Sequence, residues 1–150
     1  MEINQELAVS TKEFFDFLRQ SIVVDVKNTS GKEIEKDDIY EGMTYHKELA
    51  TKIGSTGEAK VTVSVFREPD EYVAEFDSNQ GKNITRYQIE ELGTEKIQVN
   101  YEEDFIAADR IKALNFKLVN LFYKKRAGKQ ASERLKQIEN YLISQRKNQS

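Results

Sequence analysis

Alternation of apolar and polar residues dominates the middle of the chain, between residues 43 and 106. A period of two predicts β-strands, in which successive side chains point to opposite faces. Short segments rich in Gly, Asn, Asp or Pro interrupt the pattern, so we expect five strands joined by tight turns at 54–57, 68–70, 79–81 and 92–94. The clean alternation predicts a sheet with one face on a core and the other in water.

The N-terminal region predicts one more strand and a helix. Residues 2–9 alternate like a half-buried strand, and Ser10 and Glu13 have the spacing of a capping box. A helix is therefore expected to begin directly after Ser10 and to end at residues 28–31. Its apolar stripe recurs at helical spacing and consists of Phe14, Leu18, Ile22 and Val26. Residues 32–42 are expected to form a short second helix or an irregular turn.

Residues 107–146 contain no Pro and many strong helix formers, which predicts a long helix with a kink near Gly128. A one-faced antiparallel sheet needs a cover, and this helix is the largest element that can supply it. The order of elements therefore predicts one α+β domain over residues 1–150. The helix after Gly128 is expected either to fold back or to extend beyond the sheet. In the second case we expect a homodimer through the apolar side chains of this part, Leu135, Ile138, Tyr141 and Leu142.

Three segments carry a resemblance to a known fold: STKEFFDFL at 10–18, EGMTYHKEL at 41–49 and LVNLFYKKRAGK at 118–129. The chain resembles the START-like domains, also called Bet v 1-like or polyketide-cyclase-like domains, in its element order, in the strand at 3–9, in the capped helix at 11–27 and in the stripe Leu114, Leu118 and Phe122. More closely, the three segments make the chain resemble an uncharacterised Firmicutes family of that fold. The resemblance implies a helix grip, in which a curved antiparallel sheet of about six strands packs on a long C-terminal helix. It also implies a function, since most such domains bind apolar ligands between helix and sheet, whereas some are lyases, cyclases or hydrolases and some regulate chaperones.

Composition removes several classes of function. The 150 residues include no Cys and one His, which excludes zinc ribbons, iron–sulfur clusters, thiol catalysis and disulfide-stapled folds. No apolar run reaches the roughly 20 residues of a membrane span, and the N-terminus lacks the basic start of a signal peptide. We therefore expect a cytoplasmic protein. No nucleotide-binding glycine motif or nucleophile elbow is present, so we expect no cofactor and no metal and assign no catalytic residue.

The net charge of −3 hides an uneven distribution of charge. Residues 1–106 hold 12 basic and 23 acidic residues, whereas residues 107–150 hold 11 basic and 3 acidic residues. This pattern is typical of a basic tail that binds nucleic acid or a membrane surface, or of a basic helix that lies against an acidic body. We favour the second interpretation and expect no nucleic-acid partner, because the densest basic run lies on the expected helix. That run is Lys124, Lys125, Arg126 and Lys129.

Tyrosines and two charged residues share the inward parity of the strands. The hydroxyls of Tyr45, Tyr72, Tyr87 and Tyr101 are expected either to line a pocket or to reach the rim of a filled core. Because an unpaired buried charge is costly, Lys47 and Glu103 either pair with each other in a solvated cavity or reach water near the open end of the sheet. Gln5 has the same parity. His46 has the outward parity, and the chain holds no second His for a metal site.

These observations favour a non-catalytic domain that holds a small apolar or aromatic ligand between the sheet and the C-terminal helix. The residues expected to line this site are Phe14, Tyr45, Lys47, Tyr87, Tyr101, Glu103, Leu118 and Phe122. Two alternatives stay open. One is a protein–protein interaction domain with a filled core, and the other is a cyclase- or hydratase-type enzyme with a Tyr or Glu103 as acid or base.

Overall fold

The computed structural model describes residues 1–50, 56–107 and 110–148, with the backbone alone at 49–50, 56 and 110–125. Its elements follow the order that the hydrophobic pattern predicts. They are β1 (Glu2–Leu7), α1 (Thr11–Ser30), the 3₁₀ helix η1 (Lys36–Asp38), β2 (Thr44–Ala50), β3 (Thr56–Arg67), β4 (Glu71–Ser78), β5 (Gly81–Gly93), β6 (Lys96–Ala107) and α2 (Arg110–Asn148).

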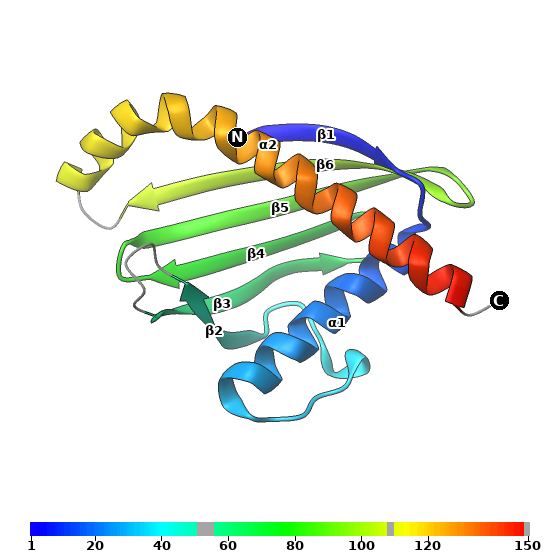
Figure 1. Cartoon of the computed structure of the whole chain (residues 1–150). Coiled ribbons are helices and arrows are strands. Elements are labelled where there is room, and N and C mark those ends of the chain that lie inside the picture. The colour runs from blue at the N-terminus through cyan, green and yellow to red at the C-terminus, as the bar shows by residue number, and fades with distance from the viewer. Residues whose placement is uncertain (51–55, 108–109, 149–150) are drawn as a thin grey trace.

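The strands form one antiparallel six-stranded sheet in the order β1-β6-β5-β4-β3-β2. Strand β1 therefore closes one edge beside β6, while β2 forms the opposite edge. The sheet is curved, and both α1 and α2 lie on its concave face (Figure 1). Helix α1 packs beside β2, whereas α2 packs across β1 and β6. The predicted α+β helix-grip architecture is thus confirmed.

Helix α1 begins at the capping box that the sequence predicts. The Glu13 N–H donates to Ser10 Oγ at 3.1 Å, and the Ser10 N–H donates to Glu13 Oε1 at 2.9 Å. Gly31 ends the helix in the left-handed region, with φ at 72°, and its N–H donates to the Lys27 carbonyl at 2.9 Å. The polar segment that follows contains η1 and is otherwise irregular.

An apolar core fills the space between the concave face and the helices. Side chains of this kind contribute about 1.5–3 kcal/mol each when they are fully buried. The largest fully buried ones come from β1, α1, β3, β6 and the β1–α1 connection: Leu7, Val9, Phe14, Phe15, Ile22, Val61, Val63, Ile97 and Val99.

The second half of α2 belongs to this core, because it crosses the concave face of the sheet (Figure 1). Leu135 and Leu142 are buried, and Ile138 packs against the same cluster. These three side chains are therefore covered by the chain itself, and the homodimer through this helix stays a prediction. Tyr141 stays 49% exposed.

Helix α2 continues through Gly128 and passes close to β1 there. A Cβ atom on Gly128 would lie 3.7 Å from Ile3 Cγ2, an ordinary van der Waals distance, so α2 passes next to the sheet edge without requiring a glycine there. Within the described part of the chain, neither helix is long and apolar enough to cross a membrane.

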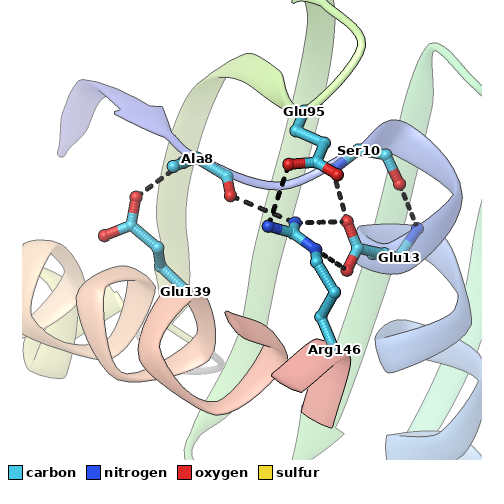
Figure 2. Close-up of polar contacts among 6 residues, drawn as sticks. All are labelled: Ala8, Ser10, Glu13, Glu95, Glu139 and Arg146. Carbon is cyan, nitrogen blue, oxygen red and sulfur yellow. Dashed lines mark hydrogen bonds and ion pairs between the residues drawn. The ribbon is translucent and has the colours of Figure 1, made fainter. Parts of the chain in front are cut away.

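Arg146 fastens the end of α2 to the junction between β1 and α1 (Figure 2). Its Nη2 donates to Glu13 Oε1 at 2.7 Å and its Nε donates to Glu13 Oε2 at 3.2 Å. The same guanidinium pairs with Glu95 at 3.1 Å and donates to the Ala8 carbonyl at 3.3 Å. Glu13 thereby caps α1 and holds α2 at the same time.

Glu139 makes a second contact of α2 with this junction (Figure 2). Its buried carboxylate accepts the Ala8 N–H at 2.6 Å and pairs with Lys136 at 2.8 Å. Burial acts to raise the pKa of Glu139, but the bonds from Lys136 and Ala8 outweigh it and lower the pKa. Burial likewise opposes the bonds from Arg146 and Ser10 at Glu13, whose pKa is also lowered.

The basic residues of α2 differ in their contacts. Arg134 and Arg146 pair with acidic residues of the sheet and α1, in line with a basic helix that lies against an acidic body. Arg126 and Lys129 are exposed. The side chains of Lys124 and Lys125 lie outside the described residues.

Arg146→Met should lower the free energy of unfolding by about 1 kcal/mol, because it removes partly exposed ion pairs but keeps most of the apolar stem. Chemical denaturation followed by circular dichroism measures this change. Lys129→Met, an exposed position on the same helix, is the matched control. Equal stability of the Arg146→Met and wild-type chains would show that the contact to Glu13 adds nothing.

Low pH should weaken the contacts of α2 with the same junction between β1 and α1. A carboxyl group whose pKa is lowered by folding contributes stability above its unfolded pKa, and loses that contribution as pH falls through its folded pKa. The pKa values of Glu13 and Glu139 lie below their ordinary value of 4.5, so stability should fall as pH drops below about 4.5. Denaturation curves at decreasing pH measure how steeply the free energy of unfolding falls with pH. The fall should be shallower in Glu139→Gln than in the control Glu33→Gln, in which an exposed carboxylate is replaced.

Candidate ligand-binding site

An aromatic row crosses the concave face of the sheet. The residues Phe66, Tyr72, Tyr87 and Tyr101 lie opposite one another on β3, β4, β5 and β6. Neighbouring ring centroids are 5.7, 5.8 and 4.9 Å apart along this order. These distances are within the range of favourable aromatic pairs. Because of the strand register, the inward-facing aromatic residues of four separate strands form one continuous surface.

Helix α1 and two arginines cover this row. Phe14 lies 5.9 Å from Tyr87 and Phe15 lies 5.7 Å from Phe66, measured between ring centroids. Arg134 of α2 lies over Tyr101, with its Cζ atom 5.9 Å from the centroid. At the other end, Arg19 of α1 lies over Phe66 at 5.0 Å. Cation–π contacts of this kind favour a fixed placement of the arginines.

A polar cluster lies beside the Tyr101 end of the row. Glu103 accepts a hydrogen bond from the Tyr101 hydroxyl at 2.8 Å and another from Asn83 Nδ2 at 3.2 Å. The guanidinium of Arg134 is 3.8 Å from Glu103 Oε2. The Oδ1 atom of Asn83 is buried and has no hydrogen-bond partner. The cluster thus joins β5, β6 and α2 and leaves one buried acceptor unused.

Hydroxyl groups on the same face are also unused. Within the described part of the chain, the hydroxyls of Tyr45, Tyr72 and Tyr87 have no hydrogen-bond partner. Tyr72 is only 7% exposed, and burial raises its pKa well above the ordinary value. Burial also raises the pKa of Tyr87 to about 12, with Arg134 opposing the shift and Glu103 adding to it. The ring of Tyr87 lies next to that of Tyr101, whose hydroxyl belongs to the polar cluster.

Lys47 does not pair with Glu103, and the hypothesis of that pair is wrong. The two residues lie on β2 and β6, which are separated in the sheet by β3, β4 and β5. Lys47 pairs with Asp25 of α1 at 3.2 Å and is partly exposed. Burial, with a smaller effect from Asp25, raises the pKa of Tyr45, which belongs to the same buried cluster as Tyr72.

The structure therefore brings together four of the eight residues predicted for the site, namely Phe14, Tyr87, Tyr101 and Glu103. The side chains of Leu118 and Phe122 lie outside the described residues. Gln5 is satisfied because its Oε1 accepts from the Ser132 hydroxyl at 2.6 Å.

His46 lies outside the site, on the outward parity that the sequence predicts. It is exposed and pairs with Glu58 at 3.1 Å. Among the residues that the structure describes, no three His, Asp or Glu side chains cluster in a way that would hold a metal ion.

Sequence reasoning missed Asn83 and Arg134. Asn83 has the same parity as Thr85 and Tyr87, so the alternation of β5 contained the signal that it faces inward. Arg134 carried no comparable signal, because its role depends on how α2 lies over Tyr101. Arg134 also lines an open depression of about 250 Å³ on α2, together with Gln130, Glu133 and Gln137.

Solved structures show the class of fold. The chain is similar to a START superfamily protein from Mycobacterium smegmatis, with 14% identity and a TM-score of 0.61 over 96% of this chain and 97% of that one. A protein of unknown function from Staphylococcus aureus, SA2116, matches 99% of this chain with 96% of its own, at 15% identity and a TM-score of 0.63. A conserved protein from Geobacillus kaustophilus matches 95% of this chain with 94% of its own, at 14% identity and a TM-score of 0.61. The likeness shows a START-like fold and nothing finer.

The particular family follows from the sequence itself. The chain belongs to the family described as Domain of unknown function (DUF3284), which matches residues 1–124. Among curated proteins, none matches the chain.

Alkaline titration should reveal the buried tyrosines. A tyrosine whose pKa is raised by folding stabilises the fold fully below its unfolded pKa, and this contribution is lost as pH rises through the folded pKa. Near-ultraviolet absorbance of tyrosinate should therefore include a late component, and Tyr87→Phe should remove part of it near pH 12. An unchanged late component in Tyr87→Phe would contradict the burial of this hydroxyl.

Proposed function

We propose that residues 1–150 form one START-like domain that holds a small apolar or aromatic ligand between the concave sheet and α2. The observation that carries the proposal is the buried Oδ1 of Asn83, which has no hydrogen-bond partner among the described residues and lies on the same face as the tyrosine row. Buried polar groups in proteins normally have partners, and a ligand supplies partners when it binds.

Small side chains beside the aromatic row support the same proposal. Ala74 and Thr85 lie opposite each other on β4 and β5, and Thr85 lies opposite Glu103 on β6. They sit next to Tyr72 and Tyr87 along the strands, and they are much shorter than these tyrosines. Ala74 is fully buried and Thr85 is 8% exposed, so a ligand above them would take the place of side chains that now cover them, with Tyr87, Tyr101 and Phe14 on one side of it.

The remaining predicted residues are part of this proposal. We place Leu118 and Phe122 on the α2 side of the ligand, because the resemblance to START-like domains puts the C-terminal helix there. Tyr45 and Lys47 would lie at the far end, near the β2 edge. We also expect a cytoplasmic protein, from the lack of an apolar span and of a signal-peptide pattern in the sequence, and a Firmicutes origin, which the resemblance implies.

The alternative is a protein–protein interaction domain with a filled core. The dense packing of Phe14, Phe15 and Ile22 with Leu135 and Leu142 favours it for the α1 end of the concave face. The two functions differ in whether the face above Ala74 accepts added volume.

Ala74→Leu separates these two functions. If a ligand site lies above Ala74, the added atoms should change the free energy of unfolding by less than about 1 kcal/mol and should weaken binding of the neutral dye Nile red. In a filled core the same change costs about 1–3 kcal/mol. Ala131→Leu is the matched control, since Ala131 is buried in the core cluster where α2 meets the sheet.

Denaturation curves and dye fluorescence measure the two effects, and native mass spectrometry of the purified chain looks for a ligand that stays bound. Loss of stability in Ala74→Leu equal to that in Ala131→Leu, with no saturable dye binding, would establish the filled core and reject the ligand-binding function.

A further inference from the structure

The two helices that cover the concave face are held to it in different ways. Helix α1 contributes five buried apolar side chains, and two of them, Phe14 and Phe15, pack against aromatic rings of the sheet. In α2, Ile138 and Ile143 pack against the core only in part. The buried apolar side chains of residues 126–148 are Ala127, Ala131, Leu135 and Leu142. Because two of these four are alanines, this half of α2 buries less apolar surface than α1 does.

Most polar contacts of the same half of α2 lie close to water. The ion pair of Arg146 with Glu13 joins side chains that are 32% and 26% exposed, and the other carboxylate partner, Glu95, is 57% exposed (Figure 2). Ser132 and Gln5 share a neutral hydrogen bond and are both only partly buried. When such contacts break, water replaces the lost partners, so each of them resists separation only weakly.

The charged residues of this half keep a partner or reach water when the helix moves away. The buried carboxylate of Glu139 accepts the Ala8 N–H, but its ion-pair partner Lys136 lies on the same helix. On separation, Glu139 keeps Lys136 and regains the hydration that burial removed. Arg134, which pairs with Glu103, is already 61% exposed. Separation therefore leaves no unpaired buried charge on α2.

Gly128 is the only glycine of α2, and nearly all of these contacts follow it in the chain. Glycine stabilises a helix less than alanine does and is a common place for a helix to bend. A Cβ atom at this position would make an ordinary contact with Ile3 at 3.7 Å, so close packing does not require the glycine. A bend at Gly128 would carry residues 129–148 away from the sheet as one unit.

We propose that residues 129–148 of α2 form a strap that opens from the sheet about Gly128 while the sheet and α1 stay folded. Because α2 packs across β1 and β6, the opening exposes inward-facing apolar residues of these two strands. It also releases the Ala8 N–H, which bonds to Glu139 of the strap. The opening goes beyond the function proposed above and does not depend on it, because it occurs without a ligand.

Hydrogen exchange of individual backbone amides, measured by NMR on the purified chain, tests the strap. The protection factors of residues 131–142 should agree with that of Ala8 and should be about tenfold or more below those of β4 and β5. A shared, lower protection shows that the strap opens as one unit before the sheet unfolds. If the strap is as protected as β4 and β5, α2 leaves the sheet only when the whole domain unfolds, and the proposal is overturned.

Val61→Ala weakens the part of the domain that stays folded. Val61 is buried on β3, which β4 and β5 separate from β6. The variant should lower the protection of β4 and β5 about tenfold and leave that of residues 131–142 unchanged. A parallel loss of protection in the strap would show that it opens only together with the sheet, and would overturn the proposal.

Arg146→Met removes contacts that the opening breaks, so it should lower the protection of the strap about fivefold. Lys129→Met is the matched control and should leave the protection at its wild-type value. Unchanged protection of the strap in Arg146→Met would contradict the proposal. This comparison retains the test if Val61→Ala fails to fold.

Gly128→Ala tests the position of the bend. Alanine resists bending of the helix, so the protection of the strap should rise about threefold to fivefold. If β4 and β5 gain protection while the strap does not, the bend lies elsewhere and the hinge at Gly128 is rejected. Saturable binding of Nile red by a chain whose strap does not open separately would reject this inference alone and leave the proposed function in place.

Discussion

The structure depends on covering one face of a curved antiparallel sheet, and the contact of α2 with the β1–α1 junction determines how that cover lies. A sheet with a single apolar face must bury it against another layer. Apolar side chains such as Leu135 and Leu142 provide most of the energy, but apolar contact alone has little directional preference. Glu13 adds direction, because the same carboxylate caps α1 and accepts two hydrogen bonds from Arg146. Helix α2 is thereby oriented relative to α1 and to the sheet.

This arrangement divides the concave face into two regions of different chemistry. At one end, α1 packs against β2 and the second half of α2 packs against β1 and β6, with an apolar core between them. Farther along the strands, the face changes from tyrosine rings to short side chains and then to the polar cluster of Asn83 and Glu103. The tyrosine rings lie at the boundary, since their rings pack in the core while the hydroxyls of Tyr72 and Tyr87 have no partner there.

The charged residues on the two faces of the sheet make different kinds of contact. The outer face carries ion pairs between neighbouring strands, such as Lys82 with Glu75 and Arg86 with Glu71, which are partly exposed and contribute little each. On the concave face, Glu103 is mostly shielded from water and its three partners come from β5, β6 and α2. The acidic body and basic helix of the sequence thus meet in a few defined contacts, at Glu103 and at Glu13.

The sequence by itself determined the elements and the inward residues of the strands, because these depend on local periodicity and local hydrogen bonds. The sequence pattern alone predicts the capping box at Ser10 and the glycine that ends α1. It also predicts the inward parity of Tyr72, Tyr87 and Tyr101. Only the tertiary structure decided which side chains meet. Strand order separates Lys47 from Glu103, the path of α2 brings Arg134 over Tyr101, and the same path buries Leu135 instead of leaving it for a second subunit. These pairings join residues far apart in the chain, and their energies depend on distances that no periodicity encodes.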